Sequence, residues 1–113
     1  MSKSRNLGEF EILVLAALVR LKDNAYGVAI RNEIEERAER SVSVGALYAT
    51  LSRLEEKQYV HSEMGLATAE RGGRAKRFYK LSALGTTQLQ RSIAALGRML
   101  DGVDPEAAQI EAQ

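Results

Sequence analysis

The sequence predicts a mostly α-helical fold with a small β-hairpin, and three patterns along its 113 residues support this prediction. Apolar residues recur at helical spacing in four segments, 6–21, 25–40, 43–56 and 82–101. Residues 59–64 and 75–81 are predicted to form two strands. They contain β-branched and aromatic residues and lie on either side of a stretch that contains glycine. That stretch, 65–74, is longer than most hairpin loops, and long hairpin loops are often functional.

Composition limits the classes of protein to which the chain can belong. Sixteen basic and fifteen acidic residues give a net charge of +1, so nucleic-acid binding must be argued from where the charges lie. The chain has no cysteine, which excludes disulfide scaffolds and thiolate metal sites. Its longest apolar run, 12–19, is far shorter than the roughly 18 residues of a membrane span, and a signal-peptide pattern is missing. We therefore expect a cytoplasmic protein with no membrane partner.

The first helix is predicted to begin near Asn6, a possible cap to which Glu9 can reach back. Seven apolar residues form its main face: Leu7, Phe10, Leu13, Val14, Ala17, Leu18 and Leu21. Ile12, Leu15 and Val19 add apolar surface elsewhere around the same helix. More than one face therefore needs cover, either from a central position in the core or from a partner subunit.

The second and third helices are separated by few residues, which is typical of a helix-turn-helix pair. Asn24 is expected to cap the second helix and Ser43 the third. An apolar stripe of the third helix is expected to pack inward: Val44, Leu47, Leu51 and Leu54.

The opposite face of the third helix is small and polar, with Gly45, Ala49, Ser52 and Arg53. A DNA major groove about 12 Å wide admits a helix whose exposed side chains are short enough to approach the base edges. The hairpin then has five basic residues without an acid between them: Arg71, Arg74, Lys76, Arg77 and Lys80. A helix followed by a basic hairpin is typical of DNA-binding winged helix-turn-helix domains, so residues 1–81 are assigned to such a domain.

The last helix, 82–101, has a seam of apolar residues spaced by four, three and four: Leu89, Ile93, Leu96 and Leu100. This spacing is that of a heptad repeat, and homodimerisation is its expected use. Packing on the first helix of the same chain is the alternative, and both can hold. Residues 102–113 form an acidic tail that is either flexible or a short helix.

The chain resembles the PadR family of winged-helix transcriptional regulators, in particular its short members with a single C-terminal dimerisation helix. The resemblance covers residues 7–100 and rests on three blocks: Ala25-Tyr26-Gly27-Val28, SVGALYATLSRLE at 43–55, and GGRAKRFYKLS at 72–82 followed by Gly85. It implies a homodimeric repressor that binds a near-palindromic double-stranded DNA operator and is released by a small aromatic or apolar effector. We expect that effector to bind where the final helices meet the first helix.

The chain departs from the family pattern at two positions in the third helix and its end. Ala49 stands where a proline is common, and Gln58 stands where a glycine usually follows the helix. Gln58 is therefore expected to take up a left-handed backbone conformation. The chain also has no tryptophan, so an effector pocket built from tryptophan is not expected.

These arguments give a set of expected DNA-contacting residues: Ser43, Gly45, Tyr48, Ala49, Thr50, Ser52, Arg53, Arg74, Lys76 and Arg77. We expect no cofactor and no metal site, because His61 is the only histidine, and no enzymatic activity, because nucleophile and cofactor motifs are missing. The alternative is a winged-helix protein-interaction module without operator binding, since Arg53 is the only base of the third helix before Lys57.

Overall fold

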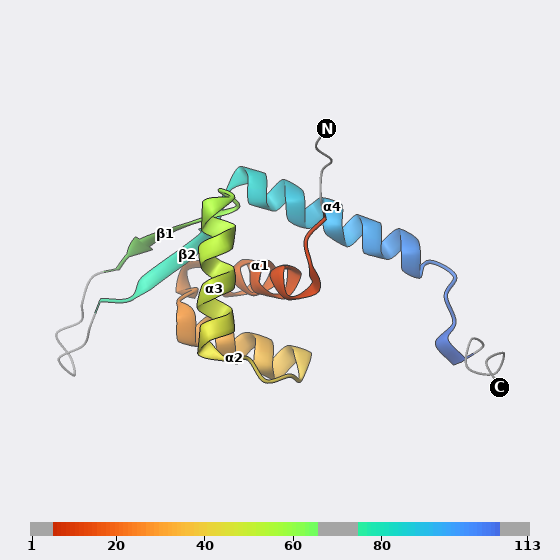
Figure 1. The fold of residues 1–113 in the computed structure, drawn as a ribbon, viewed down its shortest axis with the longest axis horizontal. Helices are drawn as coiled ribbons and strands as arrows, with labels where there is room; N and C mark the ends of the chain where they lie inside the picture. The colour runs from red at the N-terminus through yellow and green to blue at the C-terminus, as the bar shows by residue number, and fades with distance from the viewer. Residues whose placement is uncertain (1–5, 66–74, 107–113) are drawn as a thin grey trace.

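The computed structural model describes residues 6–65 and 75–106, which form four α-helices and one two-stranded antiparallel sheet. The elements follow in the order α1 (Glu9–Leu21), the 3-10 turn η1 (Lys22–Asn24), α2 (Gly27–Ala38), α3 (Val44–Glu56), β1 (Val60–Met64), β2 (Arg77–Leu81) and α4 (Ala83–Leu100). In Figure 1, α1, α2 and α3 form a compact unit, the hairpin projects from one side of it, and α4 runs past the other. The predicted fold class is confirmed.

Helix α1 lies at the centre of the unit, where it contacts α2, α3, α4 and β2. Val14 and Leu15 of α1 are completely buried, whereas Val19 is 54% exposed. Around α1 lie the buried apolar side chains of the other elements: Ile30, Ile34, Leu47, Leu51, Leu54, Val60, Tyr79 and Leu89. Of the three residues that extend the apolar surface of α1, Leu15 is buried within its own chain, Ile12 is half-buried and Val19 is exposed, so the chain covers only part of this surface.

Two helices begin later than the sequence predicted. Helix α1 begins after Gly8, whose N–H donates to Oε1 of Glu11 at 2.9 Å, so the capping pair lies two residues beyond Asn6. Asn24 belongs to η1 and does not cap α2, which begins after Tyr26. Tyr26 is extended and pairs with Phe78 of β2 in an isolated antiparallel bridge, and the Tyr79 N–H donates to the Ala25 carbonyl at 2.9 Å. Backbone that is bonded to β2 in this way cannot be helical.

The caps of α3 and α4 are as predicted. The Ser43 Oγ accepts a hydrogen bond from the Ala46 N–H at 3.0 Å, and the Ser82 Oγ accepts one from the Gly85 N–H at 2.9 Å. Each serine satisfies one of the backbone donors that the first turn of a helix leaves free.

The end of α3 also follows the prediction, since Gln58 has a left-handed backbone with φ of 67°. The Gln58 N–H donates to the Glu55 carbonyl and the Tyr59 N–H to the Leu54 carbonyl, both at 2.9 Å. This pair of bonds is a Schellman motif, which satisfies the last carbonyls of the helix.

No helix among residues 6–65 and 75–106 is long and apolar enough to span a membrane. At the C-terminal end, Pro105 and Glu106 are helical, and the Glu106 N–H donates to Oδ1 of Asp104 at 3.1 Å. Residues 107–113 of the predicted tail lie outside the described residues.

Candidate nucleic-acid interface

Helix α3 presents a face of small and polar side chains to solvent. Gly45, Ala49, Ser52 and Arg53 are all exposed, as the sequence predicted. At Gly45, a Cβ atom would have no neighbour within 4 Å apart from the adjacent residues and the backbone of α3 itself. The backbone of α3 is thus open to close approach by another surface along this face.

Tyr48 lies at the edge of the same face and is 43% exposed. Its hydroxyl packs against Gly27 at the start of α2, so closely that a Cβ atom on residue 27 would overlap it. The side chain therefore covers the junction of α2 and α3 and still presents part of its ring to solvent. From the sequence, two roles were open for Tyr48: contact with DNA, or coverage of the contact with α2. The structure shows the second.

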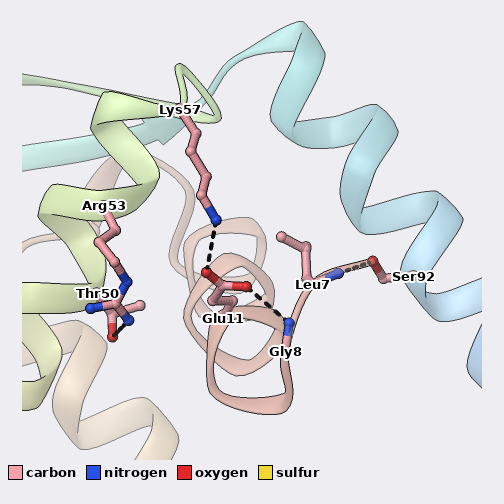
Figure 2. A network of polar contacts seen from close by, with 7 residues as sticks. All are labelled: Leu7, Gly8, Glu11, Thr50, Arg53, Lys57 and Ser92. Carbon is pink, nitrogen blue, oxygen red and sulfur yellow. Dashed lines mark hydrogen bonds and ion pairs between the residues drawn. The ribbon is translucent and has the colours of Figure 1, made fainter. Parts of the chain in front are cut away.

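Two expectations for α3 are wrong. Thr50 is only 3% exposed, and its Oγ1 accepts a hydrogen bond from Nη2 of Arg53 at 3.2 Å, so it cannot contact DNA (Figure 2). Val44, expected to be buried, is 52% exposed, because burial of α3 begins at Leu47. The inward stripe is Leu47, Thr50, Leu51 and Leu54, so it keeps three of the four predicted residues and has Thr50 in place of Val44.

The basic residues of the hairpin lie on both of its faces. Lys76 places its Nζ 4.1 Å from the centre of the Tyr26 ring, on the side of α2. Arg77 points toward α3, where its Nη1 donates to the Ser62 Oγ at 3.0 Å, and the Ser62 hydroxyl donates to Oε2 of Glu55 at 2.8 Å. Both charged groups stay exposed. Arg71 and Arg74 lie outside the described residues.

Beneath the hairpin, burial raises the pKa of the Tyr79 hydroxyl, with Tyr48 and Glu55 adding to the rise and Arg77 opposing it. Tyr79 therefore stays neutral at physiological pH. Elsewhere, hydrogen bonds from Arg20 and Arg37 lower the pKa of Glu33 and keep it ionised, which joins α1 to α2.

The C-terminal half of α4 carries large apolar side chains in solvent. Ile93 is 52% exposed, Leu96 49%, Met99 74% and Leu100 63%. Leu89, the first residue of the predicted dimer seam, is only 7% exposed and packs in the core of its own chain, so this part of the prediction is wrong. The first half of α4 covers α1 and the hairpin, and the seam becomes free only from Ile93 onward.

A groove of ≈ 490 Å³ runs between the start of α1 and the C-terminal half of α4. Its walls are mainly apolar and include Leu7, Ile12, Leu13, Leu96 and Met99. The groove lies where the sequence led us to expect an effector site.

Several residues that hold these surfaces in place were not recognisable from sequence. Ser92 is 1% exposed, and its Oγ accepts a hydrogen bond from the Leu7 N–H at 2.8 Å, which ties the segment before α1 to α4 (Figure 2). In the same view, Glu11 lies between the Gly8 N–H and the Lys57 ammonium, whose Nζ is 3.5 Å from Oε2. The contacts of Ser92 with Leu7 and of Lys57 with Glu11 join residues far apart in sequence, and helical periodicity contains no information about them.

Among residues 6–65 and 75–106, histidine, aspartate and glutamate form no group of three that could hold a metal ion. The candidate functional surfaces of the described residues are the α3 face with its adjacent hairpin, the apolar half of α4, and the groove beside it.

Comparison with known proteins gives a consistent result. The model of the transcriptional regulator PadR-like family matches residues 14–91. A PadR family transcription regulator from Clostridium difficile is 30% identical, with a TM-score of 0.63, and the match covers 84% of this chain and 100% of that one.

A PadR-like transcription factor from Bacteroides fragilis is 25% identical over 81% of this chain and 84% of its own, with a TM-score of 0.69. The protein RosR from H. salinarum is 23% identical over 97% and 92% of the two chains, with a TM-score of 0.66, and supports the fold alone. A comparison with curated proteins found no match.

Proposed function

The chain belongs to the PadR-like family of transcriptional regulators, and we propose that it is a homodimeric, sequence-specific repressor that binds a near-palindromic DNA operator. The observation that carries this proposal is the exposed small-residue face of α3 with a basic hairpin beside it. A helix of this kind can enter the major groove, while the hairpin contacts the sugar-phosphate backbone.

In this mode of binding, Gly45 and Ala49 face the base edges, because they allow the backbone of α3 to approach closely. Ser43, Tyr48, Ser52 and Arg53 lie around them and contact phosphates or the borders of the bases. Lys76 and Arg77 supply charge to the phosphates from the hairpin, and Arg74 is assigned the same role from the sequence.

The exposed apolar half of α4 supports the homodimer. Four large side chains that are about half exposed or more would be unfavourable on a chain that works alone, and a second copy of α4 offers matching apolar surface. We assign the interface to Ile93, Leu96 and Leu100 together with Met99. The two α3 helices of the dimer should then lie about 34 Å apart, so that they enter successive major grooves.

The groove between α1 and α4 supports regulation by an apolar or aromatic effector, because its volume is that of a small-molecule site and its walls are mainly apolar. It borders the proposed dimer interface through Leu96 and Met99. An effector bound there can change how the two copies are placed relative to each other and so weaken operator binding.

A salt titration of DNA binding tests the proposal without knowledge of the operator. Replacing Lys76 or Arg77 by Ala should weaken binding to random duplex and lower the slope of log K against log salt by about 0.9 for each lost phosphate contact. Arg98→Ala removes the same charge from exposed surface of α4 and should leave the slope unchanged.

If both hairpin variants keep the slope of the unmodified protein, and a glutamate on the α3 face leaves operator binding intact, the DNA-binding proposal is wrong. The protein-interaction module would then be the better description.

A further inference from the structure

The turn that ends α3 is bonded directly to the start of α4. The Ser82 hydroxyl donates a hydrogen bond to the Gln58 carbonyl at 2.6 Å, and the Ser82 N–H donates to the Tyr59 carbonyl at 2.9 Å. The buried Gly85, in the first turn of α4, lies against the same Tyr59 carbonyl, and a Cβ atom there would overlap it. Three contacts thus join residues 58 and 59 to residues 82 and 85.

This joint has little freedom to bend. Its contacts use backbone atoms and one serine hydroxyl, which depends on a single side-chain torsion. The Schellman bonds of Gln58 and Tyr59 extend the same chain of hydrogen bonds into the last turn of α3. The ion pair of Lys57 with Glu11 restricts the angle less (Figure 2). The long lysine side chain is 50% exposed and its Nζ lies 3.5 Å from Oε2 of Glu11, so it can follow a movement of α3.

The position of the joint gives small angular changes a large effect. Gly45 lies thirteen residues before Gln58, which is about 20 Å along α3 at about 1.5 Å per residue. A tilt of about 10° between α3 and α4 would therefore move Gly45 by about 3.5 Å, which is close to the rise of one base pair. In a dimer held together through α4, the angle at this joint determines the separation of the two α3 helices.

We propose that Ser82 is a positioning residue for DNA recognition: its hydrogen bond to the Gln58 carbonyl holds α3 at the angle to α4 that matches one half-site spacing. This inference rests on the proposed dimeric DNA binding and adds to it the group that selects the spacing. Ser82 itself does not contact DNA in this arrangement.

Two substitutions separate the hydrogen bond to Gln58 from the helix cap that Ser82 also provides. Ser82→Asp keeps an oxygen that can accept from the Gly85 N–H, because aspartate is a good N-cap, but it has no proton to donate to Gln58. Ser82→Thr keeps both the acceptor and the donor and is the matched control. If the carboxylate prevents folding, Ser82→Gly replaces it, since glycine is tolerated at an N-cap and has no hydroxyl.

The probes are duplexes that the unmodified protein selects from a random pool, and the same duplexes with the half-sites one base pair closer or farther apart. We expect the unmodified protein and Ser82→Thr to lose about tenfold in affinity for either change, in line with the cost of a poorly matched site. Ser82→Asp and Ser82→Gly should lose less than about threefold or prefer a different spacing, with random-duplex affinity unchanged.

The inference is overturned if the variants without a hydroxyl keep the same preferred spacing and the same tenfold discrimination. Failure of the proposed function is a separate result, because it appears in the unmodified protein: it would select no inverted repeat or would not bind duplex at all. Sedimentation and thermal unfolding of each variant establish that it is folded and has the same number of subunits as the unmodified protein.

Discussion

Helices α3 and α4 each leave one face uncovered, yet the two faces differ in the size and chemistry of their side chains. The face of α3 has Gly45, Ala49 and Ser52, whereas that of α4 has Ile93, Leu96 and other large apolar residues. Small side chains expose little apolar area and let the backbone approach a polar partner. Large ones lose about 1 kcal/mol each for the half that stays in water, which favours an apolar partner. Exposure alone therefore does not define an interface. The size and polarity of the exposed side chains indicate which kind of partner would cover them.

The largest effect is expected from a charge on the α4 face. Leu96→Asp or Ile93→Asp would bury an unpaired carboxylate in the proposed dimer interface and weaken association by about 3–5 kcal/mol. Sedimentation should then show monomer or unfolded chain where the unmodified protein is a dimer. Leu84→Asp is the control, because Leu84 is also exposed and lies about two and a half turns before Ile93, on the opposite side of the helix from it. An unmodified protein that is monomeric at micromolar concentration would contradict the assignment of the α4 face to a dimer interface.

A charge on the α3 face should have the next largest effect, and on a different property. Ala49→Glu or Gly45→Glu adds bulk and negative charge toward the DNA, and should lower operator affinity by about 100-fold through lost base contacts and repulsion. Thermal stability should change little, because both positions are exposed. Ala83→Glu makes the same change on exposed surface of α4 and should bind operator normally. If Ala49→Glu and Ala83→Glu lost the same operator affinity, the α3 face would not be the surface that binds the operator.

The smallest effect concerns the end of α3, where Gln58 has a left-handed backbone that glycine adopts without strain. Gln58→Gly should raise the free energy of unfolding by about 1 kcal/mol, because the steric cost of a side chain there is removed. Denaturation by urea measures this change. Glu56→Gly, in the last turn of α3, should lower stability by about 0.5–1 kcal/mol. A destabilised Gln58→Gly would indicate that the side chain at residue 58 makes a favourable contact that outweighs the strain.

The elements themselves were predictable from sequence, because each depends on local spacing and capping. The serine caps of α3 and α4 and the left-handed Gln58 are of this kind, as is the hairpin. The errors come from contacts between distant segments. Asn24 does not cap α2, because Tyr26, two residues further on, pairs with β2 in an extended conformation. Leu89 is not available to the predicted dimer seam, because it is buried within its own chain.

The candidate site was predictable to the same degree. The exposed positions of α3 follow from its helical period, and Thr50 was misplaced because a short polar residue in the inward stripe is not recognised by hydrophobicity. Nothing local indicates that Arg77 reaches Ser62 or that Ser92 accepts from Leu7, because the partners lie 15 and 85 residues apart. The network that holds the functional surfaces is thus the part that only the structure provides.

The close fit of Tyr48 against Gly27 has a consequence for how operator preference can evolve. A side chain at residue 27 would displace the Tyr48 hydroxyl, which is the free end of a partly exposed ring and can swing outward along the α3 face. A mutation in α2 could therefore alter the proposed DNA-facing surface without belonging to it. Among descendants of this chain, residues 27 and 48 should change as a pair, with larger residues at 27 accompanied by smaller ones at 48.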